Sequence, residues 1–175
     1  MTNIILIGMM GSGKSTLSHQ LSKATGYKII DCDDLIEKQE KLLIKEIFSL
    51  YGEEHFRKLE SNFLNDFSDN GCIISTGGGM ILSAENRVRL NSLGTVFYLS
   101  GSVDTLYNRL LDQTSKRPLL EKEALANQLS ELLKKRSVLY MEASDYEISI
   151  DSKTTDEVCT EIYTILRELD YKFSV

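Results

Sequence analysis

Short apolar runs alternate with longer segments of helical periodicity along the chain. Five runs are rich enough in apolar and β-branched residues to predict buried strands, at residues 3–8, 28–31, 72–76, 95–100 and 145–150. Between these runs, apolar side chains recur three or four positions apart, which is typical of amphipathic helices. This spacing predicts helices at residues 14–25, from 33 to a break at Gly52, and at 53–67, 84–92, 103–111, 123–140 and 155–169.

The regular alternation of strands and helices indicates the fold class. A parallel pair of strands needs a crossover of helical length, so the pattern predicts a five-stranded parallel sheet with helices on both faces, a three-layer α/β/α sandwich. The length of 175 residues fits one domain, which we expect to cover residues 1–175. A polar segment at residues 112–122 contains the single proline and lacks apolar periodicity, and we expect it to be mobile.

The charge balance excludes two broad classes of function. Twenty Lys and Arg residues stand against 26 Asp and Glu residues, which gives a net charge of -6. This balance argues against a general nucleic-acid or membrane-surface binder, so a site for anions has to be local. The apolar stretch at residues 4–10 is too short to span a bilayer and continues into glycines and a lysine, so it predicts a strand rather than a signal peptide.

Cysteine and histidine usage indicates the compartment. Cys32, Cys72 and Cys159 are odd in number and form no C-x-x-C pair, which argues against a disulfide framework or a zinc cluster. A reducing cytoplasm fits this pattern. His19 and His55 lie far apart without ligand-rich neighbours, so we expect structural or surface roles for both.

A phosphate-binding motif lies between the first predicted strand and the first predicted helix. The segment G-M-M-G-S-G-K-S-T at residues 8–16 satisfies G-x-x-x-x-G-K-[ST] in full. In such a P-loop, glycines let backbone N–H groups point inward at an anion, and the following helix adds its positive end. The lysine reaches the β- and γ-phosphates and the following hydroxyl serves Mg²⁺. The residues expected to bind nucleotide here are Gly11, Ser12, Gly13, Lys14, Ser15 and Thr16.

A second acid near the metal is expected at the end of an apolar strand. The third predicted strand ends in Thr76 and glycines, whereas the second ends in Asp31, which we take as the metal-side candidate together with Ser15. Ligands of open α/β sheets collect outside the carboxyl ends of strands, so Asp31 and the glycines at 77–79 should share one rim with the P-loop. Helix capping would explain an acid at Asp33 equally well.

Six segments in this order resemble the shikimate kinase family, whose members are nucleoside-monophosphate-kinase-like P-loop proteins. The resemblance runs over nearly the whole chain. Its segments are the P-loop, D-C-D-D-L-I-E at 31–37, F-R-K-L-E at 56–60, T-G-G-G at 76–79, R-P-L-L at 117–120 and K-R-S-V-L-Y at 135–140. Apart from the P-loop each segment is weak alone, and their order and spacing make the set specific.

The resemblance implies roles on the acceptor side of the site. Asp33 would meet the hydroxyl to be phosphorylated, and Arg57 and Arg136 would hold shikimate. Guanidinium groups bind carboxylates through two parallel hydrogen bonds, which lysine cannot do. Without the resemblance, an arginine on an amphipathic helix is most often solvated surface. The backbone contacts implied for shikimate come from Gly77, Gly78 and Gly79.

The resemblance also implies a lid and contacts to the base. Arg117 would close over the nucleotide from a lid at about 112–123, and shikimate would bind a helical region at about 32–61. Together with Lys14 and Asp33, Arg117 completes the implied catalytic set. Arg109 and Lys153 are the adenine-side candidates, and Lys153 departs from the arginine that the family commonly has there.

The implied activity is Mg²⁺-dependent transfer of the ATP γ-phosphoryl group to the 3-hydroxyl of shikimate. The products would be ADP and 3-phosphoshikimate, on the route to chorismate and the aromatic amino acids. We expect a cytoplasmic monomer with no nucleic-acid or membrane partner. Two alternatives stay open: a kinase for another small acceptor, such as gluconate or a nucleoside monophosphate, and a regulatory module that hydrolyses ATP slowly.

Overall fold

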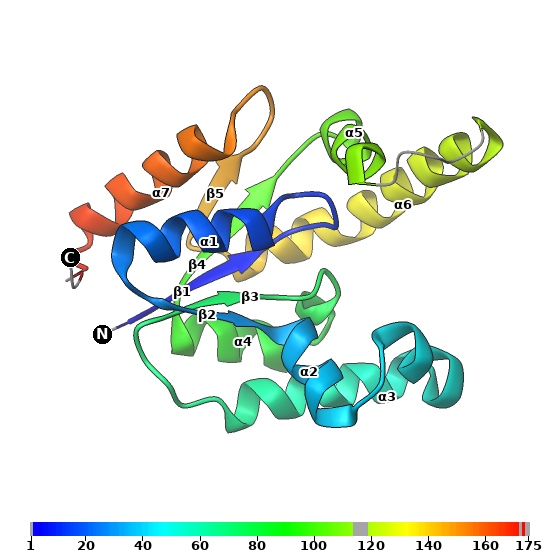
Figure 1. Ribbon diagram of the computed structural model, residues 1–175, viewed down its shortest axis with the longest axis horizontal. Helices are drawn as coiled ribbons and strands as arrows, with labels where there is room; N and C mark the ends of the chain where they lie inside the picture. The colour runs from blue at the N-terminus through cyan, green and yellow to red at the C-terminus, as the bar shows by residue number, and fades with distance from the viewer. Residues whose placement is uncertain (1, 114–118, 172, 174–175) are drawn as a thin grey trace.

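The computed structural model describes residues 2–113, 119–171 and 173, with the backbone alone at 112–113 and 119–123. A five-stranded sheet lies at its centre, with all strands parallel and in the order β2-β3-β1-β4-β5 (Figure 1). The strands are β1 (Asn3–Ile7), β2 (Lys28–Asp31), β3 (Cys72–Ser75), β4 (Gly94–Ser100) and β5 (Tyr146–Ser149). The predicted parallel sheet is confirmed.

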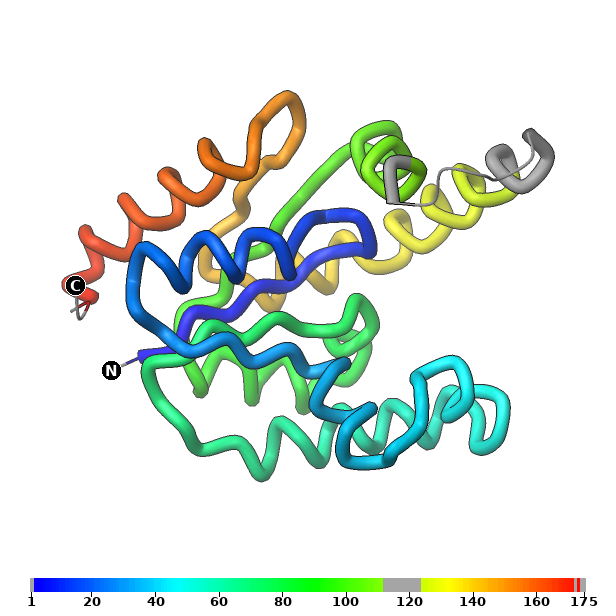
Figure 2. The backbone as a smooth tube through the Cα atoms, in the orientation of Figure 1, coloured from blue at the N-terminus to red at the C-terminus, as the bar shows by residue number. Residues whose placement is uncertain are grey.

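Helices cover both faces of the sheet, as the alternation predicts. Their bounds are α1 (Lys14–Thr25), α2 (Cys32–Glu40), α3 (Ile44–Asp66), α4 (Ala84–Leu93), α5 (Val103–Gln113), α6 (Leu119–Ala143) and α7 (Thr155–Glu168), with a 3₁₀ turn, η1, at Met80–Leu82. Helices α1 and α7 pack together on one face, while α4 packs with α3 and α6 on the other (Figures 1 and 2). The fold is therefore the three-layer sandwich of P-loop proteins.

The core forms around the central strand. Ile4, Ile5, Leu6 and Ile7 of β1 are fully buried, because helices lie on both faces of the sheet and strands pair on both sides of β1. A strand buried on both faces reads as a continuous apolar run rather than as an alternating one, which is how the sequence revealed it. Among the described helices, none is long and apolar enough to cross a membrane.

Most predicted bounds lie within three residues of those observed, and two regions differ more. The helix predicted from residue 33 to Gly52 is divided at Lys41, which has a left-handed φ of 56°, and Gly52 (φ 82°, ψ 171°) kinks α3 instead of ending it. The prediction of a non-helical segment through residue 122 was also wrong, because α6 already begins at Leu119. The segment L-L-E-K-E-A-L-A consists of strong helix formers, whose propensity outweighs the lack of a continuous apolar stripe.

At the amino ends of the strands, the buried side chain of Asn3 links three segments of the chain. Its amide nitrogen donates to the carbonyls of Asp69 (2.9 Å) and Leu93 (3.1 Å), and its amide oxygen accepts from the backbone N–H of Cys72 (3.0 Å). The Tyr171 hydroxyl donates to the Asn3 carbonyl at 3.0 Å. Asn3 and Tyr171, which lie near the two ends of the described chain, are therefore found together at the amino ends of the strands, opposite their carboxyl ends (Figure 1).

Candidate active site

The P-loop connects β1 to α1 and takes backbone conformations that glycine favours. Gly8, Gly11 and Gly13 have φ values of 150°, 79° and 88°. A Cβ atom would lie 2.8 Å from the Leu99 carbonyl oxygen at Gly8 and 2.7 Å from the Leu106 carbonyl oxygen at Gly11, so a side chain fits at neither position. The curled backbone ends where Leu17 N–H donates to the Gly13 carbonyl at 2.9 Å, in the first turn of α1.

Lys14 is folded onto the P-loop. Its ammonium donates to the carbonyls of Gly8 (2.8 Å) and Met9 (3.0 Å) and to the Ser12 hydroxyl (3.3 Å). Burial lowers the pKa of Lys14 to about 8, although the Asp33 carboxylate opposes this shift. The group is therefore mostly a cation at neutral pH, and the loop carbonyls hold it at the phosphate site.

The two carboxylate oxygens of Asp31, at the end of β2, make different contacts. Its Oδ1 accepts from the backbone N–H groups of Asp33 (3.1 Å) and Asp34 (3.4 Å), which caps α2. Its Oδ2 lies 3.4 Å from the Ser15 hydroxyl. The capping role that the sequence allowed for Asp33 thus belongs to Asp31, and Asp33 does not cap the helix.

The Ser15 and Asp31 oxygens are a donor set that suits Mg²⁺. This ion takes one or two protein oxygens and fills its remaining positions with waters and phosphate oxygens. Within the part of the chain that the structure describes, no group of three or more His, Cys, Asp or Glu side chains could hold a metal. A metal shared with a nucleotide phosphate therefore fits these residues better than a site made wholly of protein ligands.

Asp33 presents an unpaired carboxylate oxygen toward the glycine turn after β3. Its Oδ1 is buried and has no hydrogen-bond partner among the described residues. A Cβ atom on Gly77 would lie 2.6 Å from this oxygen. Burial raises the pKa of Asp33, and the Lys14 ammonium opposes the shift. An unpaired buried carboxylate oxygen is costly, so this atom is available to a ligand hydroxyl.

Arg57 is fixed by two glutamates of its own helix, α3. Its guanidinium donates to Glu60 Oε2 at 2.6 Å and to Glu53 Oε1 at 2.8 Å, and it lies over the rings of Phe48 (5.9 Å) and Phe56 (5.4 Å). The rings and the glutamates together leave the group few alternative orientations. The sequence predicts Arg57 as a ligand-binding residue but leaves these partners unidentified.

Glu60 is a member of the site that the sequence analysis missed. Its side chain is fully buried, and its second oxygen, Oε1, has no partner among the described residues. Burial raises the pKa of Glu60 to about 7, although Arg57 opposes the shift. The residue belongs to the F-R-K-L-E segment, where its three-residue spacing from Arg57 was the available signal.

The glycine turn, residues 77–79, lies between α3 and α6. A Cβ atom on Gly79 would collide with the Arg57 guanidinium. The Gly78 carbonyl accepts from the Arg136 guanidinium at 3.1 Å and from the Tyr140 hydroxyl at 2.6 Å, both on α6. The turn therefore places the two arginines on either side of it, and Tyr140 is a second residue that the sequence analysis did not assign.

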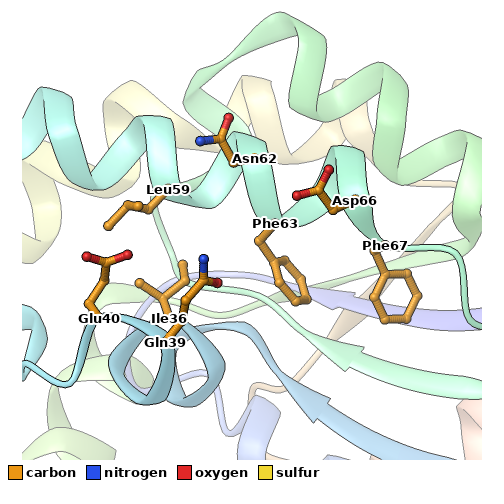
Figure 3. A pocket seen from close by; sticks show the side chains of 8 residues that line it. All are labelled: Ile36, Gln39, Glu40, Leu59, Asn62, Phe63, Asp66 and Phe67. Carbon is orange, nitrogen blue, oxygen red and sulfur yellow. The ribbon is translucent and has the colours of Figure 1, made fainter.

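The P-loop, Asp31, Asp33 and the glycine turn meet at a cavity of about 230 Å³, whereas Arg57 and Arg136 adjoin the glycine turn and do not line this cavity. Its walls come from the P-loop, from the ends of β2 and β3 and from the glycine turn, so the structure brings three of the predicted segments together. The lining residues are Met10, Gly11, Gly13, Lys14, Ser15, Thr16, Asp31, Asp33, Ser75, Thr76 and Gly78. A separate cavity of about 200 Å³ between α2 and α3, lined among others by Ile36 and Phe63, shares none of these residues (Figure 3).

Arg109 lies on the far side of the P-loop from the glycine turn. Its guanidinium donates to the carbonyls of Ser12 (3.2 Å), Ile150 (3.3 Å) and Lys153 (3.3 Å), so it joins the P-loop to the loop after β5. The Lys153 ammonium is paired with Glu161 at 2.6 Å. Arg117 lies outside the described residues.

The sheet is parallel, a P-loop follows its first strand, and two arginines flank the neighbouring glycine turn. This combination is typical of a P-loop kinase that acts on a small acceptor. Comparison with known proteins narrows this class. The shikimate kinase family profile matches residues 10–167, and the chain belongs to the shikimate kinase family. It is therefore a kinase with ATP as its co-substrate.

Individual relatives agree with this membership. The shikimate kinase of Actinobacillus pleuropneumoniae serotype 5b (strain L20) is 41% identical over 168 residues, which cover 95% of this chain and 96% of that protein. The shikimate kinase of Thermodesulfovibrio yellowstonii is 39% identical over 163 residues, 93% of each chain.

Solved structures agree as well. A shikimate kinase from Acinetobacter baumannii in complex with shikimate superposes with a TM-score of 0.87 at 34% identity, covering 98% of this chain and 96% of that one. A gluconokinase from Sinorhizobium meliloti, at 17% identity and a TM-score of 0.64 over 96% of this chain and 93% of that one, shares the fold.

Proposed function

We propose that this protein transfers the γ-phosphoryl group of ATP to the 3-hydroxyl of shikimate, which yields ADP and 3-phosphoshikimate on the route to chorismate and aromatic amino acids. One observation carries the proposal: a phosphate-binding cavity opens on the unpaired carboxylate of Asp33, and the glycine turn beside it is flanked by Arg57 and Arg136. This arrangement suits an acceptor with a hydroxyl at one end and a carboxylate at the other.

The nucleotide half of the site works by positioning and by charge. Backbone N–H groups of residues 11–16 would hold the phosphates, and the Lys14 ammonium would exchange loop carbonyls for phosphate oxygens. Mg²⁺ bound through Ser15 and Asp31 would neutralise phosphate charge. Phosphoryl transfer leaves little covalent work to the protein, so charge and alignment supply most of the catalysis.

The acceptor half supplies orientation. Arg57 and Arg136 would bind the carboxylate through paired N–H donors, with backbone support from the glycine turn. Asp33 would accept the hydrogen bond of the 3-hydroxyl and take its proton as the oxygen attacks. Because the transition state is loose, alignment of this hydroxyl matters more than the basicity of Asp33.

We assign the remaining predicted elements in the same way. Arg117, on a lid at about 112–123, would bring a cation to the transferring group, and Arg109 would face the adenine side together with the loop at Lys153. Helices of the region at about 32–61 would bind the acceptor within a single domain. We also propose a cytoplasmic monomer, which fits the free state of Cys32, Cys72 and Cys159.

A coupled assay of ADP release tests the acceptor. Purified protein is given ATP and Mg²⁺ with shikimate, gluconate or AMP, and the product is identified by mass. We expect ADP release that depends on shikimate and a product that carries one added phosphoryl group. Activity with AMP or gluconate but not with shikimate would contradict the proposal, as would ATP hydrolysis that no acceptor stimulates.

A further inference from the structure

Two donors from one helix share a single acceptor at the glycine turn. The Arg136 guanidinium and the Tyr140 hydroxyl lie one turn apart on α6, and both donate to the Gly78 carbonyl oxygen, at 3.1 and 2.6 Å. A carbonyl oxygen has two lone pairs, so it accepts both bonds at once. The shorter bond comes from Tyr140, to which the proposed reaction assigns no role.

The Tyr140 side chain is held rigidly. It is completely buried, and its ring stacks on that of Tyr98 with centroids 4.9 Å apart and planes 13° apart. Burial raises the pKa of the Tyr140 phenol above its ordinary value, so the hydroxyl remains a donor throughout the neutral range. Packing thus fixes this donor independently of any ligand.

Arg136, by contrast, is only half-buried, and the proposed reaction also assigns it to the acceptor carboxylate. If its guanidinium turns to the carboxylate of an acceptor, the Gly78 carbonyl loses a charged donor. Leaving a protein polar group unpaired is costly, and that cost would be subtracted from the binding of the acceptor. A second, fixed donor on the same oxygen removes this cost.

We propose that Tyr140 is a positioning residue that keeps the Gly78 carbonyl paired and thereby frees Arg136 to bind the acceptor carboxylate. The inference rests on the proposed function in assigning that carboxylate to Arg136. The peptide after Gly78 is planar, so fixing its carbonyl also fixes the direction of the Gly79 N–H. Gly79 lies next to the Arg57 guanidinium. The orientation of the peptide unit between Gly78 and Gly79 therefore fixes the position of the turn relative to both Arg57 and Arg136.

Removal of one hydroxyl tests the effect on binding. Tyr140→Phe keeps the ring and its stacking, and we expect the KM for shikimate to rise roughly 5- to 20-fold, as for the loss of one hydrogen bond. We expect kcat and the KM for ATP to stay within about twofold, because the P-loop side is untouched. Tyr98→Phe removes a hydroxyl from the stacked partner and is the matched control, with no expected change in KM.

A melting experiment without substrate tests the shared carbonyl directly. Tyr140→Phe and Arg136→Ala each remove one of the two donors that the described residues supply to the Gly78 carbonyl, whereas the double variant removes both. We expect the double variant to lose about 2–4 °C more in Tm than the two single losses combined, the shift for one further unpaired polar group in a chain of this size. A structural role of Tyr140 unrelated to Arg136 would give additive losses.

The outcomes separate this inference from the proposed function. An unchanged KM in Tyr140→Phe, an equal rise in Tyr98→Phe, or additive losses in Tm would each overturn the inference. Absence of shikimate phosphorylation by the unaltered protein would overturn the proposed function instead. In that case the melting experiment still shows whether Arg136 and Tyr140 share the Gly78 carbonyl as their acceptor. The KM comparison is then made with whichever carboxylated acceptor the protein uses.

Discussion

The nucleotide half and the acceptor half of the proposed site are built in different ways. The nucleotide half is one continuous segment, residues 8–16, whose backbone takes left-handed conformations at Gly11 and Gly13. The acceptor half is assembled from side chains of α2, α3 and α6 around the turn after β3. In the proposed reaction, the first half would bind phosphate through backbone N–H groups, which nearly every residue carries. The second half would bind the acceptor through particular side chains held at particular positions.

The halves also differ in how fully their polar groups are paired. Lys14 has three acceptors on the P-loop. On the acceptor side, Asp33 Oδ1 and Glu60 Oε1 are two of the three buried side-chain polar atoms that lack a partner within the described residues. The unpaired oxygens of Asp33 and Glu60 are available to hydrogen-bond a ligand. This difference between the two halves leads to three predictions.

The largest effect is expected at Asp33. Asp33→Asn keeps the size of the side chain but removes its charge and its capacity to take a proton, and we expect kcat to fall by roughly 10²- to 10⁴-fold. The Kd for ATP should change little, because the P-loop is unaltered. Stopped assays of ADP release and equilibrium titration with nucleotide measure the two quantities.

The neighbouring acid provides the control for Asp33. Asp34→Asn makes the same chemical change one residue further along α2, at an exposed position that does not line the 230 Å³ cavity. Its turnover should stay within about twofold of the original. Near-normal turnover of Asp33→Asn would remove Asp33 from the mechanism.

A pair of glycine substitutions separates ligand binding from stability. In Gly79→Ala the new methyl group would displace the Arg57 guanidinium, which is the end of a flexible side chain. We expect the KM for shikimate to rise by roughly 10- to 100-fold, since small misplacements of a binding group are costly. The displaced guanidinium also loses part of its pairing with the buried Glu60, so we expect a lower Tm as well. Steady-state kinetics and thermal melting measure the two quantities.

Gly52→Ala is expected to change stability alone. A Cβ atom there meets nothing within 4 Å, but the backbone has a φ of 82°. With a ψ of 171° this is an extended positive-φ conformation that is almost confined to glycine, and it costs an L-residue about 1–3 kcal/mol. That cost corresponds to a Tm lower by about 2–12 °C, with the KM for shikimate unchanged. A raised KM in Gly52→Ala, or an unchanged KM in Gly79→Ala, would contradict this distinction between the two glycines.

The smallest effect concerns the protonation of Glu60. Its pKa is raised from 4.5 to about 7 in the folded protein, so between these values the folded state holds a proton that the unfolded chain releases. The contribution of Glu60 to stability is therefore full below about pH 4.5 and is lost as the pH rises to about 7. Glu60→Gln does not titrate, so we expect the Tm advantage of the unaltered protein over this variant to shrink by a few degrees across that interval.

Melting curves at constant ionic strength from pH 4.5 to 8 measure this difference. Tyr98→Phe serves as the control, because burial raises the pKa of that phenol to about 12 and its offset in Tm should be constant over the series. A constant offset for Glu60→Gln would show that Glu60 is ionised equally in the folded and unfolded states.

Local patterns were sufficient for the fold and for the nucleotide half. The bounds of α1 and β2 match the prediction because Gly26, with a φ of 74°, ends the helix and the strand is a short apolar run. Lys41 was not foreseen as a helix end, because nothing in a lysine's chemistry signals a left-handed backbone. The motif at residues 8–16 is associated with one loop conformation, so its position at the carboxyl end of β1 could be predicted from the sequence.

The acceptor half was only partly predictable. Arg57 and Arg136 came from the family resemblance, but their partners depend on which elements meet in space. The Tyr140 hydroxyl donates a hydrogen bond to the carbonyl of Gly78, 62 residues earlier in the chain, and a contact at this separation cannot be predicted from sequence periodicity. Asp31 and Asp33 could not be told apart as helix cap and free carboxylate until the direction of each side chain was known.

The hydrogen bonds that Asn3 makes at the amino edge of the sheet have a practical consequence. The Tyr171 hydroxyl donates to the Asn3 carbonyl, so the described residues near both ends of the chain lie on the side of the sheet remote from the P-loop (Figure 1). A label or a surface linker attached at either end would leave the mouth of the cavity unobstructed. Immobilised protein could then report acceptor and nucleotide binding separately.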